Sequence, residues 1–148
     1  MAPSAILPRV ADDPLETARS ILTTCRTFAV VGCSSDPGRA SHRVAGFLQS
    51  RGYRVIPVHP SGGEILGERC YRDLASIPAA EGVEVVDIFR RSDQAGAHVD
   101  EAIEIGARAV WMQLGVVDEA AAERARGAGL AVVMNRCPAI DHPRFFGA

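Results

Sequence analysis

The sequence contains no lysine, so all 16 of its basic residues are arginine. This absence excludes a Schiff-base lysine, pyridoxal-phosphate chemistry through such a lysine, and the phosphate-binding lysine of Walker-type sites. The four cysteines lie far apart and form no C-x-x-C pair. The four histidines form no H-E-x-x-H or comparable cluster. The spacing therefore predicts no structural metal site.

The chain also lacks a long apolar run and a strong charge of either sign. No run approaches the roughly 20 apolar residues that a membrane-spanning helix requires, and residues 1–9 are a poor secretory signal. A net charge of −2 gives no global attraction to nucleic acid or to an anionic membrane. We therefore expect a cytoplasmic protein with neither nucleic acid nor membrane as a partner.

The 148 residues suffice for one domain with a single well-formed core. Residues 1–12 have prolines at 3 and 8 and no period, so we expect an N-terminal arm there and one domain over residues 13–148. Asp13 followed by Pro14 predicts the start of a leading helix that ends near Cys25.

Beyond this helix, short apolar runs alternate with segments of helical period. The runs predict strands at 27–31, 53–58, 83–89, 107–114 and 130–134. Helices are expected at 41–50, 92–105 and 119–126, with Ser92 and Asp118 as N-caps of the last two. Residues 64–71 predict a brief hairpin or an irregular excursion around Gly67. Residues 72–77 predict a helical turn, and residues 135–144 predict a tail without a period, packed on the surface.

The alternation of strands and helices predicts an α/β fold with right-handed βαβ crossovers. We expect a single doubly wound, Rossmann-like domain, with a five-stranded, mainly parallel sheet and helices on both faces. In such a sheet ligands bind at the carboxyl ends of the strands, near the switch in strand order. The candidate segments are therefore 32–39, 58–63, 89–91, 113–116 and 135–138.

The first of these segments joins the first core strand to a helix through Gly32-Cys33-Ser34-Ser35-Asp36-Pro37-Gly38-Arg39. A turn of this kind presents unpaired backbone N–H groups at the positive end of a helix dipole, which favours a phosphate or a carboxylate. An ordinary strand-to-helix connection has similar residues, so the ligand must be inferred from the other strand ends.

A nicotinamide cofactor requires a G-x-G-x-x-G turn and an acidic residue at the end of the second strand. Here the turn has one early glycine, and the second strand ends in Val58-His59-Pro60, without a carboxylate. NAD is therefore disfavoured. NADP is less so, because Arg39, Arg43 and His59 could contact a 2′-phosphate.

Six blocks of the sequence together resemble the stand-alone CoA-binding proteins, which are similar to the CoA-binding domain of the succinyl-CoA synthetase alpha subunit. The blocks are GCSSDPGRASHRV at 32–44, YRVIPVHP at 53–60, ILGERCY at 65–71, VDIFRR at 86–91, VWMQLGV at 110–116 and NRCPAI at 135–140. The resemblance covers about residues 24–142, in matching order. It implies that coenzyme A, or an acyl-CoA, is the ligand.

The resemblance also implies a role for each block. The turn from Gly32 through Cys33 and Pro37 to Arg39 would hold the CoA phosphates, through backbone amides and the hydroxyls of Ser34 and Ser35. Val58, His59 and Pro60 would border the adenine and ribose. The path of the diphosphate and pantetheine arm would be lined by Phe89, Arg90, Gln113, Leu114 and Gly115. Arg39, Arg43 and Arg90 would pair with phosphate charge.

Two departures from the ligases limit what the resemblance implies. The ligases carry a lysine just past the second strand, where this chain has Ser61-Gly62-Gly63. They also continue into a second domain that supplies a phosphorylated histidine, and His142 does not match that residue. We therefore expect no acyl-CoA ligase activity and no catalytic residue.

The favoured hypothesis is a non-catalytic CoA-binding carrier, sensor or partner module, with a homodimer as the default expectation. An alternative is an NADP- or CoA-dependent enzyme whose site is completed by a partner or by oligomerisation, with Asp87 or His59 as acid or base. A third hypothesis is a thiol-redox protein acting through Cys33, whose pKa the turn could lower. Against these, Cys33 suits a small packed residue, Asp87 a hydrogen-bonded structural anchor, and Arg90-Arg91 a solvated pair.

Overall fold

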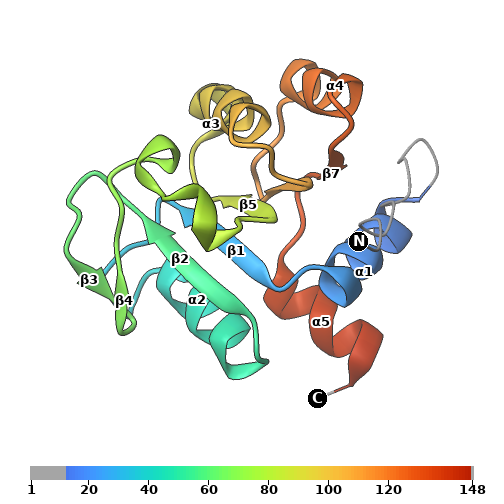
Figure 1. The fold of residues 1–148 in the computed structure, drawn as a ribbon. Helices are drawn as coiled ribbons and strands as arrows, with labels where there is room; N and C mark the ends of the chain where they lie inside the picture. Colours follow the sequence, from blue (N-terminus) through green and yellow to red (C-terminus); the bar gives the residue numbers. More distant parts are fainter. Residues whose placement is uncertain (1–12, 148) are drawn as a thin grey trace.

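The computed structural model describes residues 13–147, so the arm expected at residues 1–12 lies outside the described residues. Its centre is a parallel sheet with strand order β2-β1-β5-β6-β7 (Figure 1). The strands are Thr27–Val31 (β1), Arg54–Val58 (β2), Val85–Ile88 (β5), Ala109–Met112 (β6) and Ala131–Val133 (β7). The predicted doubly wound, Rossmann-like α/β fold is confirmed.

Helices cover both faces of the sheet (Figure 1). One face carries Pro14–Thr24 (α1), Ala40–Ser50 (α2) and Pro138–Phe146 (α5), and the other carries Ser92–Glu104 (α3) and Glu119–Gly127 (α4). The connection from β2 to β5 contains a hairpin, Glu64–Ile65 (β3) with Glu68–Arg69 (β4), and two 3-10 turns, Leu74–Ser76 (η1) and Ala79–Glu81 (η2). The predicted hairpin and helical turn are therefore confirmed.

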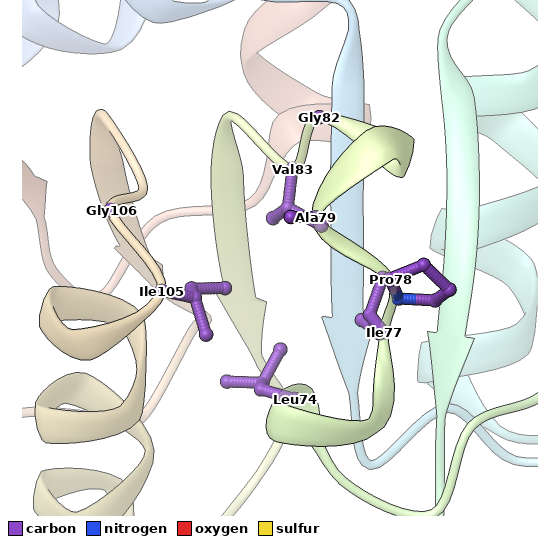
Figure 2. Close-up of a pocket in the computed structure, with 8 residues that line it drawn as sticks. All are labelled: Leu74, Ile77, Pro78, Ala79, Gly82, Val83, Ile105 and Gly106. Carbon is purple, nitrogen blue, oxygen red and sulfur yellow. The ribbon is translucent and has the colours of Figure 1, made fainter.

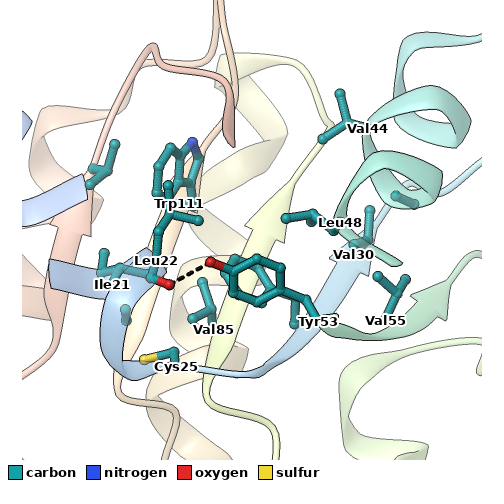
Figure 3. Close-up of a cluster of buried hydrophobic side chains, with 14 of the residues drawn as sticks. Ile21, Leu22, Cys25, Val30, Val44, Leu48, Tyr53, Val55, Val85 and Trp111 are labelled. Carbon is teal, nitrogen blue, oxygen red and sulfur yellow. Dashed lines mark hydrogen bonds between the residues drawn. The ribbon is translucent and has the colours of Figure 1, made fainter. Parts of the chain in front are cut away.

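Each face of the sheet has its own hydrophobic core, because successive strand side chains point to opposite faces. Phe28 and Val30 of β1 belong to the core under α1 and α2, whereas Ala29 and Val31 belong to the core under α3 and α4. Figure 3 shows the first core, where the Tyr53 hydroxyl donates a hydrogen bond to the Leu22 carbonyl. This bond connects the start of the second strand segment to α1.

The C-terminal segment is a helix, so the prediction of a tail without a period is wrong. In α5 the buried face includes a carboxylate: Asp141 is 1% exposed and accepts two hydrogen bonds of 2.7 Å from the Arg136 guanidinium. Pro143 also lies inside the helix. A buried, paired carboxylate and an internal proline together conceal the apolar period on which the sequence prediction depended.

Ser92 is also placed differently from the prediction. Arg91 is the N-cap of α3, and it makes no side-chain capping hydrogen bond. The Ser92 hydroxyl instead donates to the Gly115 carbonyl at 3.2 Å and accepts from the Val117 N–H at 2.9 Å. Ser92 therefore holds the loop after β6 rather than its own helix. The predicted cap at Asp118 is confirmed, since its carboxylate accepts from the Ala121 N–H at 3.0 Å.

The strand order places a switch point between β1 and β5. From β1 the chain moves outward to β2 and then returns to the other side of β1 to form β5. The loops after β1 and β5 therefore leave in opposite directions and open a crevice at their carboxyl ends, as in other doubly wound sheets.

No described helix has the length and apolar character needed to cross a membrane.

Candidate functional site

A cavity of about 350 Å³ lies at this switch point. Its walls come from three loops, those that follow β1, β5 and β6. The lining residues are Gly32, Arg39, Ala40, Ser41, Phe89, Arg90, Arg91, Leu114, Gly115 and Val116. The structure thus brings together six of the predicted site residues, namely Gly32, Arg39, Phe89, Arg90, Leu114 and Gly115.

Gly32 sets the close approach of two of these loops. Its φ is +80°, in the left-handed region, and a Cβ atom here would lie 2.3 Å from the Phe89 carbonyl oxygen. The N–H groups of Gly32 and Cys33 both donate to the Val58 carbonyl, at 2.9 and 3.2 Å. Only glycine allows the chain to leave β1 while it lies directly against the end of β5.

Two helices begin at the cavity without a capping side chain. The N-caps of α2 and α3 are Arg39 and Arg91, and neither makes a side-chain capping hydrogen bond. By contrast, the caps of α1 and α4 are Asp13 and Asp118, whose carboxylates accept backbone N–H groups. The cavity therefore meets the positive ends of two helix dipoles, a setting that attracts an anion.

The turn before α2 does not present its amides as freely as the sequence suggested. Besides Gly32 and Cys33, the N–H of Ser34 donates to Ser41 Oγ at 3.0 Å, and that of Asp36 donates to Ser34 Oγ at 3.0 Å. The N–H of Gly38 donates to Asp36 Oδ1 at 2.8 Å. Within the described chain, the donors left for a ligand are the Ser35 amide and the first-turn amides of α2.

Three arginines line the same cavity, Arg39, Arg90 and Arg91. Arg90 donates to Gln94 Oε1, and Arg91 forms an exposed ion pair with Asp93 at 3.4 Å. Guanidinium groups can make paired hydrogen bonds to phosphate oxygens. The sequence placed Arg91 in the candidate segment 89–91, with a solvated pair as the alternative, and the structure places it in the lining of the cavity.

The third wall is the loop after β6, which is apolar at its rim and fixed at its base. Leu114 and Val117 are 53% and 43% exposed. The Gly115 N–H donates to Asn135 Oδ1 at 2.7 Å, and Ser92 holds Gly115 and Val117 as described above. Sequence reasoning did not identify Ser92 or Asn135 as supports of this wall, because their partners are 23 and 20 residues away.

The other predicted site residues do not line this cavity. Cys33, Val58 and Gln113 are buried, with exposures of 0%, 3% and 5%. The end of the second strand continues into His59 and Pro60, with His59 Nδ1 2.8 Å from Ser61 Oγ. Ser35 and Pro37 on the turn and Arg43 on α2 are exposed, whereas Ser34 is half-buried. Contacts of these residues with a ligand stay predictions.

Cys33 does not have the properties of a reactive thiol. Burial, with smaller contributions from Cys70 and Asp87, raises the pKa of Cys33 to about 12. A buried, protonated thiol is a poor nucleophile. The hypothesis of a low-pKa Cys33 is therefore wrong, and the alternative of a small packed residue agrees with its place in the core.

Asp87 is buried within β5, without the hydrogen-bond partners that the sequence led us to expect. It lies on β5 opposite Val30 and Trp111, and neither carboxylate oxygen has a hydrogen-bond partner in the described chain. Burial raises the pKa of Asp87 well above its usual range. Asp87 is 0% exposed and does not line the cavity, so its carboxyl group does not contact the space in which a ligand would lie.

The fold and the cavity define a Rossmann-like domain with a cavity at its switch point, where two helices begin. A family model described as a CoA binding domain matches residues 26–143 of the chain. The chain belongs to this CoA-binding family, and the resemblance drawn from its six sequence blocks is confirmed.

The chain is similar to proteins of comparable length and to part of a longer synthetase. The chain is 36% identical over 124 residues to YneT of Bacillus subtilis strain 168, described as uncharacterized, covering 84% of this chain and 90% of YneT. A hypothetical protein from Pyrococcus horikoshii OT3 is 36% identical with a TM-score of 0.86, covering 95% of this chain and 97% of that one. A dinucleotide-forming acetyl-coenzyme A synthetase from Ca. Korarchaeum cryptofilum is 25% identical with a TM-score of 0.67, covering 76% of this chain and 26% of the synthetase.

Proposed function

We propose that the protein binds coenzyme A, or an acyl-CoA, in the switch-point cavity and acts as a non-catalytic carrier, sensor or partner module. The observation that carries this proposal is the convergence of two uncapped helix N-termini and three arginines on one cavity. Such an arrangement suits the diphosphate of a nucleotide. Membership of the CoA-binding family supports CoA over other nucleotides.

In this arrangement the diphosphate lies between the first turns of α2 and α3. The apolar rim at Leu114 and Val117 then suits the pantetheine arm or an acyl group, because it offers exposed aliphatic surface next to the charged part of the cavity. The adenosine extends the other way, over the carboxyl end of β2 and toward His59 and Pro60. In this orientation a single CoA molecule makes the contacts that the family resemblance implies for its adenosine, its diphosphate and its pantetheine arm.

The absence of catalysis is also part of the proposal. The two acid or base candidates of the enzyme hypothesis were Asp87 and His59. Asp87 is fully buried and does not line the cavity, and His59 is engaged through Nδ1 with the Ser61 hydroxyl and the Ser61 amide. Cys33 is buried and protonated. Among the described residues that line the cavity, none forms a nucleophile with an adjacent base. A homodimer stays a prediction.

The test is calorimetric titration of the protein with CoA, dephospho-CoA, NAD and NADP in parallel. We expect micromolar or tighter binding of CoA, which corresponds to roughly −8 kcal/mol, and much weaker binding of NAD and NADP. Tighter binding of NADP than of CoA would replace the proposal with a dehydrogenase-type function. Failure of all four ligands to bind would refute nucleotide binding at this site.

A further inference from the structure

A second cavity, of about 280 Å³, continues the carboxyl edge of the sheet beyond β2. It is lined by Gly62, Gly63, Arg69, Cys70, Tyr71, Arg72 and Ser76. Tyr71 forms a parallel bridge to Val58, and its carbonyl accepts the His59 N–H at 2.9 Å. The chain after the hairpin thus runs beside β2 as an extra edge segment, and the cavity lies next to the loop at His59.

The charged groups of this cavity are two guanidinium groups without an ion-pair partner in the described chain, those of Arg69 and Arg72. The Arg69 guanidinium lies over the Tyr71 ring, 5.0 Å from its centroid. Glu64 is opposite Arg69 in the hairpin register but forms no ion pair with it within residues 13–147. The adjacent Asp73 is used locally, since its Oδ1 accepts from the Ser76 N–H at 2.8 Å and from the Ser76 hydroxyl at 2.6 Å.

Glycine keeps the cavity open where the ligases have a lysine. Gly62 and Gly63 have φ values of +63° and +83°, and a Cβ at Gly62 would lie 3.5 Å from Arg72 Nε. A long side chain in this loop would therefore compete for space with the Arg72 side chain. The chain contains no lysine, and the arginines Arg69 and Arg72 line the cavity together with these two glycines.

We propose that Arg69 and Arg72 bind a phosphate monoester of the nucleotide, which is the 3′-phosphate of CoA, and so determine specificity for CoA over dephospho-CoA. This inference rests on the proposed function. The edge segment at Tyr71 is two strand spacings from β1, about 10 Å, so one ligand can place its diphosphate in the switch-point cavity and its ribose phosphate between these guanidiniums. A dianionic monoester suits a pair of guanidiniums, each of which offers paired donors.

The experiment measures the affinities of CoA and dephospho-CoA for the wild-type protein, Arg69→Gln, Arg72→Gln and the double variant. We expect the wild type to bind dephospho-CoA at least tenfold more weakly than CoA. Each single substitution should weaken CoA about tenfold and leave dephospho-CoA within twofold, and the double variant should no longer distinguish the two ligands. Arg19→Gln, an exposed arginine on α1, is the matched control and should change neither affinity.

The outcomes separate this inference from the proposed function. If the wild type binds CoA and dephospho-CoA equally, or if the variants weaken both ligands alike, the assignment of the monoester to Arg69 and Arg72 is wrong while CoA binding stands. If Arg43→Gln, and not Arg69→Gln or Arg72→Gln, selectively weakens CoA, the phosphate lies against α2 instead. If the wild type binds neither ligand, the proposed function fails first and this inference falls with it. Thermal melts of each variant establish that the fold is intact.

Discussion

The two ends of the same parallel sheet carry cavities of similar size and opposite chemistry. At the carboxyl ends of β1, β5 and β6, three arginines and two uncapped helix N-termini surround about 350 Å³. At the amino ends of β5 and β6, Figure 2 shows a cavity of about 240 Å³ lined mainly by aliphatic side chains, with Leu74, Val83 and Ile105 around it. Among the described residues, neither arginine nor any other charged residue lines the cavity at the amino ends.

The direction of the helices explains the difference. In a parallel βαβ arrangement every crossover helix begins at the carboxyl end of one strand and ends at the amino end of the next. The carboxyl edge therefore receives N-terminal dipole ends and free N–H groups, which attract anions, while the amino edge receives carbonyl ends, as at the end of α3 near Ile105. The topology alone makes one cavity suitable for phosphate and leaves the other as a gap between apolar side chains.

The largest expected difference between the two ends is in the stability cost of substituting a glycine at each. Gly32→Ala should lower the free energy of unfolding by about 3 kcal/mol or more, because its Cβ would lie 2.3 Å from the Phe89 carbonyl oxygen. Gly106→Ala, at the amino end, is the matched control: its φ of +76° is also strained, but nothing lies within 4 Å of the added Cβ. Its cost should be about 1 kcal/mol. Urea unfolding of both variants measures the contrast, and equal costs would contradict the close-approach explanation.

The next largest effect is expected when the same bulky substitution fills each cavity in turn. Ala40 and Ala79 are exposed, each is the first residue of its helix or turn, and each lines one cavity. Ala40→Trp should weaken CoA binding at least 100-fold, about 2.7 kcal/mol, because the indole fills the space between α2 and α3. Ala79→Trp should leave the affinity within twofold. Calorimetry of both variants tests the assignment, and the reverse pattern would move the ligand to the amino end.

The third prediction concerns Asp87, the carboxyl group buried within the central strand β5. Because burial raises the folded-state pKa of Asp87, its contribution to stability is fully present below the unfolded pKa and is lost as the pH rises through the folded pKa. Asp87→Asn removes this loss, so the variant should gain stability relative to wild type as the pH rises from about 4 to 8, by about 2 kcal/mol at pH 8. Urea unfolding across this pH range measures the difference.

The matched control for Asp87→Asn is Asp93→Asn, whose side chain is 71% exposed. An exposed carboxylate in a surface ion pair should change the stability by less than about 0.5 kcal/mol at any pH. If the wild type and Asp87→Asn have the same stability profile between pH 4 and 8, then Asp87 is not held neutral by the fold.

The smallest expected effect concerns the loop that forms the third wall of the carboxyl cavity. Ser92→Ala removes the hydrogen bonds to the Gly115 carbonyl and from the Val117 N–H, at 3.2 and 2.9 Å. We expect a loss of about 1 kcal/mol in stability and faster hydrogen exchange at Val117. Exposed Ser50→Ala on α2, whose hydroxyl donates to Phe47 only, should leave this loop unchanged. Unaltered exchange at Val117 in Ser92→Ala would show that other contacts fix the loop.

Sequence reasoning succeeded where local patterns and topology carry the information. The five strands and the hairpin follow from apolar runs and turn residues, and the position of the cavity follows from the rule for doubly wound sheets. It failed at α5, where the buried Asp141 is compatible with the core only because Arg136 neutralises it. It also failed at Ser92, whose partners across the cavity belong to another loop.

The electrostatic character of single residues could not be predicted at all. Cys33 follows a strand and precedes a helix, a sequence context that favours a lowered thiol pKa, but the folded chain encloses it and raises the pKa instead. Asp87 required partners by the ordinary rule for buried carboxylates, yet the core gives it none in the described residues. Desolvation depends on which segments pack over a side chain, and the local sequence does not contain that information.

The sequence by itself determined the α/β class, the family and the edge of the sheet where the switch-point cavity lies, because strand and helix periods, and the order of the six blocks, are local properties of the chain. Only the tertiary structure decided which residues meet there. It brought the uncapped starts of α2 and α3, at Arg39 and Arg91, to one cavity. It also engaged most backbone amides of the Gly32–Arg39 turn in hydrogen bonds within the chain, and it placed Arg69 and Arg72 beside the end of β2. These juxtapositions depend on contacts between distant segments, whose geometry is set by packing on the sheet.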